Sequence, residues 1–282
     1  MRPVSALREA ARITRREAKN FYIAFLTLPR EQRLGIYALY AFFRRADDIA
    51  DGPGTLREKK KALARLRKGI SAPGNDPIFV ALDWARWRFS IPKELLEAVL
   101  RGVEMDLERT RYATFSDLEE YCWHVAAAVG LAVLRVLGAP PEADAPGERF
   151  GIGMQLVNIV RDVKEDLARG RVYIPQEELA RFGVTEEELI QGRITPGIHS
   201  LLSSLAERAE GYLREVNRLL PLVPPLGRPC IGILARVYGR LLRRIGKRGF
   251  DVFRERVSLA GWEKVWLLLS GVPQSLRCRV SW

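Results

Sequence analysis

The stretch that decides the fold reads Gln155-Leu156-Val157-Asn158-Ile159-Val160-Arg161-Asp162-Val163-Lys164-Glu165-Asp166. Its apolar residues recur at three- and four-residue spacing, which predicts a helix. Four polar residues share one face of this helix at offsets of three, four and four: Gln155, Asn158, Asp162 and Asp166. A solvated face usually carries more Lys and Glu, so the stripe predicts amides and carboxylates turned towards a functional site.

A second predicted helix repeats the acidic spacing and reads Tyr40-Ala41-Phe42-Phe43-Arg44-Arg45-Ala46-Asp47-Asp48-Ile49-Ala50-Asp51. Asp47 and Asp51 are four residues apart, so both carboxylates lie on one helix face, about 5–6 Å from each other. Like charges at this spacing destabilise a bare helix, and the helix dipole disfavours anions near its C-terminal end. A sequence accepts this double cost more readily where cations bind.

A single pair of aspartates is usually solvated surface, but two pairs beside arginines on apolar helices favour a metal site. Oxygen ligands select a hard cation, so we expect Mg²⁺, with Mn²⁺ as the alternative. A di-iron bundle would need Glu-x-x-His on two helices, and neither His124 nor His199 stands in such a motif. Mg²⁺ completes its shell with water and phosphate oxygens, and the arginines beside the acidic clusters would hold phosphate: Arg44, Arg45, Arg161, Arg169 and Arg171.

Helical periodicity also runs through the rest of the chain, and strand signals are nearly absent. Breaks that contain Pro or Gly separate the periodic segments, and none of them looks like a flexible linker. We therefore predict an all-α fold in which residues 1–282 form a single domain. The segments predicted to be helical are 30–49, 55–70, 93–107, 116–137, 145–167, 198–219 and 229–245. Ser116 and Glu119 have the spacing of a capping box.

Composition narrows the functional class further. The 282 residues include 46 Lys and Arg against 34 Asp and Glu, a formal net charge of +12, and 48% are hydrophobic, which excludes disorder across the whole chain. Three scattered cysteines exclude a disulfide framework and favour a reducing compartment. No secretory signal stands at the N-terminus, and the longest apolar run, 125–134, is too short to cross a membrane. We expect a cytoplasmic protein.

Aromatic residues gather ahead of the first acidic cluster, and the bland interpretation for most of them is ordinary core. They are Phe21, Tyr22, Phe25, Tyr37, Tyr40, Phe42 and Phe43. A metal–phosphate mouth over an apolar tunnel predicts a substrate with a diphosphate head and a hydrocarbon tail, which is an isoprenoid diphosphate.

These residues resemble the squalene/phytoene synthase family over roughly residues 18–264. The motifs that carry the resemblance are Lys19-Asn20-Phe21 with Leu28-Pro29, Tyr40-x-x-x-Arg44-x-x-Asp47-Asp48-x-x-Asp51, Met105-Asp106-Leu107, Tyr121-Cys122-x-x-Val125-Ala126 with Val129-Gly130, Gln155-x-x-Asn158-x-x-Arg161-Asp162-x-x-x-Asp166, Arg171-Val172-Tyr173, and the late run Tyr238…Gly249-Phe250-Asp251-Val252-Phe253…Arg256-Val257. Both acidic motifs in this order are very specific. The chain departs from the usual pattern at Glu17-Ala18-Lys19-Asn20 and at Ala126-Ala127-Ala128.

The resemblance implies a helical isoprenoid-synthase bundle with a central apolar cavity, and it assigns roles to individual residues. The implied Mg²⁺ ligands are Asp47, Asp51, Asn158, Asp162 and Asp166, and the residues implied to hold diphosphates are Lys19, Arg44, Gln155, Arg161, Tyr238 and Arg256. Tyr121 is implied to lie at the reacting centre, and Phe21, Phe25 and Tyr37 to lie along the prenyl chain.

The implied reaction joins two prenyl diphosphates through a cyclopropane intermediate with release of diphosphate. Either the released diphosphate or Tyr121 would accept the proton. Phe25 and Tyr37 are bulky at positions implied to lie deep in the tunnel, which favours farnesyl diphosphate and a presqualene- or squalene-type product of 30 carbons. The alternative is a phytoene synthase that uses geranylgeranyl diphosphate. NADPH use and the pathway served (hopanoid, sterol or carotenoid) stay open.

A hypothesis of another class is a non-catalytic, basic peripheral membrane module. Its cationic stretch would be Arg236, Arg240, Arg243, Arg244, Lys247 and Arg248, which would rest on anionic lipid at the inner face of the membrane. Nucleic acid is not expected as a partner, because no helix-turn-helix or zinc-finger pattern accompanies the charge. The oligomeric state is left open, a monomer included.

Overall fold

The computed structural model describes residues 3–276 and Val280, apart from the side chains of residues 19–20, 264–265 and 271–276. Within this part of the chain the regular elements are all helical, and the only strand-like feature is an isolated bridge between Arg111 and Val172. The elements are α1 (Pro3–Glu17), α2 (Lys19–Phe25), α3 (Arg30–Asp51), α4 (Leu56–Ser71), α5 (Pro77–Phe89), α6 (Lys93–Glu108), α7 (Phe115–Cys122), the π-helix η1 (Trp123–Ala127), α8 (Ala128–Leu137), η2 (Pro141–Ala143), α9 (Asp144–Arg161), α10 (Val163–Ala168), α11 (Gln176–Phe182), α12 (Glu186–Gln191), α13 (Pro196–Leu213), α14 (Val216–Leu219), η3 (Leu220–Leu222), α15 (Arg228–Lys247) and α16 (Gly261–Leu276). The prediction of an all-α fold is confirmed.

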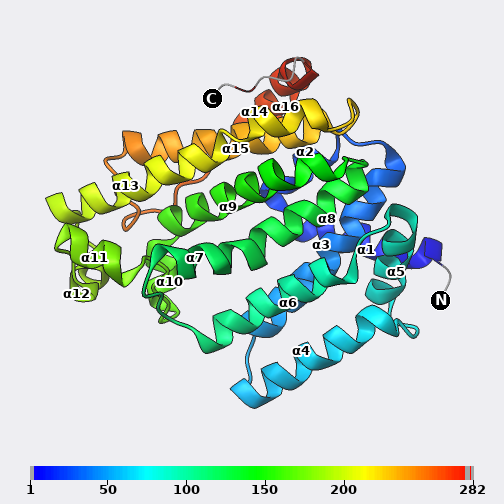
Figure 1. The fold of residues 1–282 in the computed structure, drawn as a ribbon, viewed down its shortest axis with the longest axis horizontal. Coiled ribbons are helices and arrows are strands. Elements are labelled where there is room, and N and C mark those ends of the chain that lie inside the picture. The colour runs from blue at the N-terminus through cyan, green and yellow to red at the C-terminus, as the bar shows by residue number, and fades with distance from the viewer. Residues whose placement is uncertain (1–2, 277–279, 281–282) are drawn as a thin grey trace.

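Helix α9, which carries the amide and carboxylate stripe, lies near the middle of the bundle (Figure 1). It packs against α13 and α15 on one side and against α7, η1 and α8 on the other. Helix α3, which carries the other acidic cluster, packs against α1, α5, α6 and α8. The two acidic helices are therefore held on opposite walls of the same interior.

Local sequence chemistry sets several of the helix ends. Thr55 and Glu58 form a reciprocal capping box at the start of α4, and Asp76 caps α5 ahead of Pro77. The capping box predicted at Ser116 is wrong, because Thr114 caps α7 with Asp117 as its partner. A box of the same kind forms, but on the N–H groups of Thr114 and Asp117, because the helix starts two residues earlier.

The long helix predicted over residues 145–167 is broken at Asp162. This residue has φ −102° and ψ 16°, and it separates α9 from α10. The backbone N–H of Asp166 still donates to the carbonyl of Asp162 at 2.9 Å, so the two aspartates keep their one-turn relationship. The break changes the direction of the helix at the acidic end of the stripe, but both aspartates stay together.

Helices α7, η1 and α8 form one continuous apolar segment through the bundle. The segment Phe115–Leu137 is long and apolar enough to cross a membrane by composition alone, and half of it is buried inside the protein. It packs against α6 and α9, which marks it as a core helix. Close packing here requires glycine at Gly102 and Gly151, where an added Cβ would lie 2.6 Å from Val125 and 3.0 Å from Ala127.

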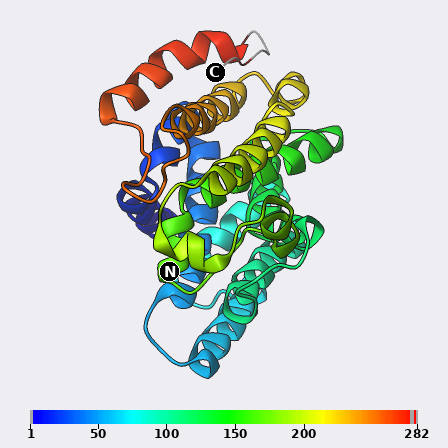
Figure 2. The same cartoon turned by 90° about the vertical axis from the view of Figure 1, so that its left-hand side faces the viewer.

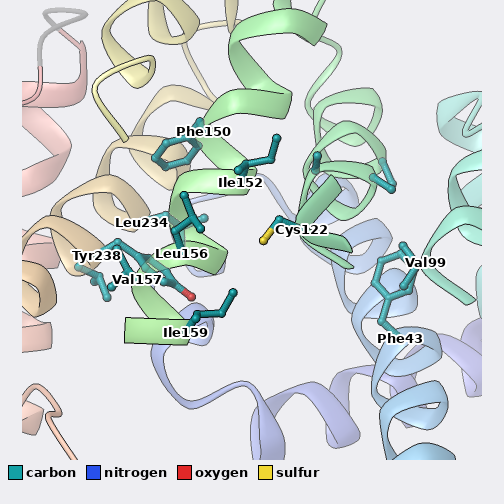
Figure 3. Packing of buried hydrophobic residues seen from close by; sticks show 14 of the residues in the cluster. Phe43, Val99, Cys122, Phe150, Ile152, Leu156, Val157, Ile159, Leu234 and Tyr238 are labelled. Atoms are coloured by element: carbon teal, nitrogen blue, oxygen red, sulfur yellow. The ribbon is translucent and has the colours of Figure 1, made fainter. Parts of the chain in front are cut away.

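The core around α9 is built from branched and aromatic side chains. Figure 3 shows Phe150, Leu156 and Val157 of α9 near Leu234 and Tyr238 of α15. Cys122 and Cys230 are both buried free thiols, and Cys278 lies outside the described residues.

Candidate active site

Two adjoining cavities occupy the space between α3 and α9. One is apolar and about 380 Å³ in volume, and the other is polar and about 160 Å³. Five residues line both of them: Asp47, Val103, Asp106, Tyr121 and Gln155. The polar pocket therefore opens into the apolar cavity past these side chains, and a substrate with a charged head and an oily tail would cross this boundary.

The polar pocket brings together the four predicted aspartates and a fifth, Asp106. Asp47 and Asp51 come from α3, Asp162 and Asp166 from the α9–α10 junction, and Asp106 from the end of α6. Asp47 is exposed to solvent on one side, but the protein atoms around it and the charges of Asp51 and Asp106 raise its pKa to about 7 against the opposing effect of Arg44. Burial and the charge of Asp162 likewise raise the pKa of Asp166 to about 7. Crowded carboxylates of this kind are stabilised by a bound cation.

Asp162 behaves differently because two arginines hold it. Arg161 donates to it at 2.7 and 2.5 Å, and Arg256 donates to both of its oxygens at 2.8 Å. Although burial raises the pKa of Asp162, these hydrogen bonds hold it below its ordinary value. Asp51 is held more loosely, by Arg169 at 3.1 Å and Arg171 at 3.4 Å.

A stack of tyrosines lies where the two cavities meet. The rings of Tyr121 and Tyr173 are 5.0 Å apart, and Tyr112 packs beside both. Asp106 accepts hydrogen bonds from Tyr173 at 2.7 Å and from Tyr121 at 3.2 Å. Burial raises the pKa of Asp106 in spite of these bonds. Burial and the charge of Asp106 also keep the pKa of Tyr121 well above its ordinary value, so Tyr121 holds its proton.

The donor set of the polar pocket fits a hard divalent cation. Its lining offers carboxylates and two amides, Gln155 and Asn158, and these are the oxygen ligands that Mg²⁺ prefers. Among the described residues, no three acidic, histidine or cysteine side chains converge closely enough to hold one ion on their own. Ions there would complete their shells with water and phosphate oxygens. Asn158 also donates to Gln155 at 3.1 Å, which orients the two amides together.

The apolar cavity runs from this boundary along several helices. Phe21 and Phe25 of α2, Tyr40 and Phe43 of α3, and Tyr238 of α15 contribute aromatic walls. Tyr37 is not among the residues that line the cavity, and its place along the prenyl chain stays a prediction. It is buried behind Phe25, with their ring centroids 6.4 Å apart, and it also stacks against Tyr22. The side chain turns away because Tyr37 lies on the α1 side of α3, where Thr14 donates to its carbonyl.

Three of the predicted diphosphate contacts are not found facing the pocket. Arg44 pairs with Asp48 at 2.7 Å and lines neither cavity. Arg161 and Arg256 both point at Asp162 instead of standing free for phosphate. The side chain of Lys19 lies outside the described part of the chain. Gln155 lines both cavities, and Tyr238 lines the apolar one.

Two polar residues in the pocket lining had no role assigned from sequence, although each stands in a motif quoted above. They are Asp106 and Tyr173. Asp106 is a partly buried acid at the end of the amphipathic helix α6, on its apolar side, and this position is the signal that could have found it. Tyr173 follows Val172, whose N–H donates to the carbonyl of Thr110, and such long-range contacts with residues 110–113 bring the tyrosine to α7.

Comparison with known proteins gives one consistent result. A family model described as squalene/phytoene synthase matches residues 14–263. The 15-cis-phytoene synthase of Synechococcus elongatus is 33% identical over 277 residues, covering 92% of this chain and 90% of that protein. The phytoene synthase of Thermus thermophilus is 35% identical over 258 residues, covering 91% and 89%.

Solved structures agree with the sequence matches. A crystal structure of a dehydrosqualene synthase in complex with a ligand superimposes with a TM-score of 0.90 at 30% identity, covering 98% of both chains. The squalene synthase HpnC from Alicyclobacillus acidocaldarius gives a TM-score of 0.81 at 27% identity, covering 87% of this chain and 95% of that one. The chain therefore belongs to the squalene/phytoene synthase family of prenyltransferases, which join two prenyl diphosphates head to head and bind them with divalent metal ions.

Proposed function

We propose that this chain joins two molecules of geranylgeranyl diphosphate and that phytoene is its product. The observation that carries the proposal is the length of the apolar cavity. Its wall follows the α7–α8 segment from Tyr121 to Leu134, which at about 1.5 Å per residue is roughly 20 Å. An extended carbon chain advances about 1.25 Å for each bond of about 1.5 Å. On that basis a geranylgeranyl chain is about 19 Å long and a farnesyl chain about 14 Å.

The relatives named above support the same substrate, since both curated proteins are called phytoene synthases. They favour the alternative over the farnesyl reading that Phe25 and Tyr37 suggested. That reading treated both residues as a tunnel floor, and Tyr37 lies behind the wall. Phytoene formation ends in proton loss, so the proposal requires no NADPH.

The polar pocket is the proposed site of diphosphate departure. Asp47, Asp51, Asp162 and Asp166 would hold the ions with Asn158, and we propose that the ions are Mg²⁺. When bound, Mg²⁺ neutralises the diphosphate and makes it a better leaving group. Arg169 and Arg171 lie in the same lining and would donate to phosphate oxygens.

The apolar cavity is the proposed site of carbon–carbon bond formation. Its wall excludes water from an allylic cation, and the aromatic rings beside the boundary present π faces that attract positive charge. Tyr121 stands at the boundary with its proton retained, so it donates hydrogen bonds and is a poor base. The released diphosphate is therefore the better candidate to accept the proton.

Farnesyl diphosphate is the second candidate, and Phe25 is the observation that favours it. This buried side chain lines the cavity and narrows it from α2. The structure that superimposes at a TM-score of 0.90 is a dehydrosqualene synthase. A narrowed cavity would select the shorter tail.

Mass spectrometry of the products separates the two candidates. Purified protein with Mg²⁺ would receive farnesyl or geranylgeranyl diphosphate, each with and without NADPH. We expect a 40-carbon product from geranylgeranyl diphosphate that does not depend on NADPH. A 30-carbon product as the main outcome would refute the chain-length proposal and restore the farnesyl reading. No product from either substrate would leave the membrane-module hypothesis as the better one.

A further inference from the structure

Helix α16 lies on the outside of the bundle against α15, as Figure 2 shows. Three large apolar side chains of this helix are exposed at offsets of four and three residues. Trp262 is 72% exposed, Trp266 46% and Leu269 71%. Residues at these spacings share one helix face, so they form a single apolar stripe turned to solvent. A stripe of this kind is a mark of a binding surface.

Basic residues of α15 border the stripe. The guanidinium of Arg240 lies over the ring of Trp266, 4.4 Å from its centroid. Arg243 and Lys247 continue the cationic row and are exposed, and within the described part of the chain neither forms an ion pair or a side-chain hydrogen bond. Glu263 of α16 is buried, and its carboxylate accepts from Arg244 and from the backbone of Ala260. The described surface next to the stripe is therefore basic.

We propose that this face, Trp262, Trp266 and Leu269 with Arg240, Arg243 and Lys247, rests on the surface of an anionic phospholipid bilayer. Indole rings favour the boundary between hydrocarbon and water, and basic side chains beside an apolar helix face attract acidic headgroups. A protein partner that covered only the apolar stripe would not require the unpaired basic side chains beside it. The cationic stretch expected from sequence to meet lipid lies along α15, and α16 adds the apolar half of the surface.

Helix α16 lies close to the helices that line the apolar cavity. Its inner side packs on α2 and α15, and these two helices supply Phe21, Phe25, Ile231, Leu234 and Tyr238 to the wall of the apolar cavity. A bilayer at α16 would thus lie one helix layer away from the cavity. This last step rests on the proposed function, since a water-insoluble hydrocarbon product must leave the cavity for lipid. The contact surface itself does not depend on the substrate.

Vesicle sedimentation with the full chain tests the proposal without any catalytic readout. Vesicles of phosphatidylcholine alone would be compared with vesicles that also contain phosphatidylglycerol. We expect binding to the anionic vesicles that weakens with salt. The double variant Trp262→Ser and Leu269→Ser should bind at least about tenfold more weakly, and Arg243→Glu with Lys247→Glu should lose a similar factor.

Matched variants on other helices provide the controls. Trp87 of α5 is 80% exposed and Leu56 of α4 is also exposed, so Trp87→Ser with Leu56→Ser removes the same side chains elsewhere. Lys61→Glu with Arg65→Glu makes the same charge change on the exposed side of α4. Both control variants should bind like the parent protein.

A second measurement uses the unmodified protein, so it does not depend on how the variants fold. Brominated lipids in anionic vesicles should quench its tryptophan emission. Absence of binding and quenching, or undiminished binding by the Trp262 and Leu269 variant, would overturn the proposal. A dimer in analytical ultracentrifugation that this variant dissociates, without vesicle binding, would overturn it in favour of a contact between two copies of the chain.

Discussion

Replacing Gly130 with leucine should shorten the prenyl chain that the apolar cavity accepts. Gly130 lines this cavity on α8, and an added Cβ would meet only the carbonyl oxygen of Gly147, at 3.8 Å. The position lies nine residues beyond Tyr121 in the same helical segment, about 13 Å along its axis. A farnesyl chain of about 14 Å ends near this depth, and a geranylgeranyl chain must continue past it.

The size of the expected effect follows from the volume and the hydrocarbon that is displaced. A leucine side chain at this position would fill a substantial part of a cavity of about 380 Å³. The fourth isoprene unit contributes five carbons, and burial of each is worth about 0.8 kcal/mol. Exclusion of the whole unit would therefore cost up to about 4 kcal/mol, or several hundredfold in relative kcat/KM.

The assay is competition between the two substrates in one reaction, with the ratio of 30- to 40-carbon products read by mass spectrometry. Gly211→Leu is the matched control, because Gly211 lies on α13 with nothing within 4 Å of an added Cβ. Both variants should fold, since glycine in a helix interior costs about 0.8–1 kcal/mol relative to alanine. A folded Gly130→Leu protein with an unchanged product ratio would show that the tail does not pass this wall.

Three further predictions concern the acidic pocket and the packing around it. In metal-free protein the thermal midpoint should rise by a few degrees as the pH falls from 8 to 5. Asp47 and Asp166 have folded pKa values of about 7, so over this range the folded protein binds protons that the unfolded chain binds only near pH 4. Asp47→Asn should flatten this dependence in calorimetry, and an unchanged slope would contradict the assignment. Asp106→Asn should lower kcat by about 10- to 100-fold with little change in stability, because Tyr121 and Tyr173 lose a charged acceptor. The control Glu104→Gln, on the outside of α6, should have a kcat near that of the unmodified protein. Gly153→Ala should destabilise the fold by about 1–3 kcal/mol in urea, because its Cβ would lie 2.8 Å from the backbone nitrogen of Leu213, and Gly211→Ala should not.

Much of the helical architecture follows directly from the chain's periodic segments. The helix predicted over 93–107 is α6 to within one residue, and that over 30–49 is α3 with one more half-turn. The short helices α11 and α12 have seven and six residues, too few turns for periodicity to be visible. Helix α16 was missed because its outward face is apolar, so that it lacks the polar face by which an ordinary surface helix is recognised.

The residues of the site also differ in how far sequence predicts them. Pairs one turn apart, such as Asp47 with Asp51, are visible in sequence because helix geometry fixes their relationship. The direction of a long side chain is not fixed in this way. Arg44 has two acidic neighbours within reach and takes Asp48, and Arg256 crosses 94 residues of sequence to reach Asp162. Asp106 and Tyr173 become recognisable only where α6, α7 and the loop after α10 meet.

The charge of the polar pocket constrains the order in which it fills. Its lining holds five carboxylates, Asp47, Asp51, Asp106, Asp162 and Asp166, against two arginines. A diphosphate would be repelled by this surplus, so cations must enter before it or together with it. Cations on Asp51 and Asp162 would compete with Arg169, Arg171 and Arg256 for the same carboxylate oxygens. Arginines released in this way become donors for phosphate, which reconciles the position of Arg256 on Asp162 with its predicted role in holding diphosphate.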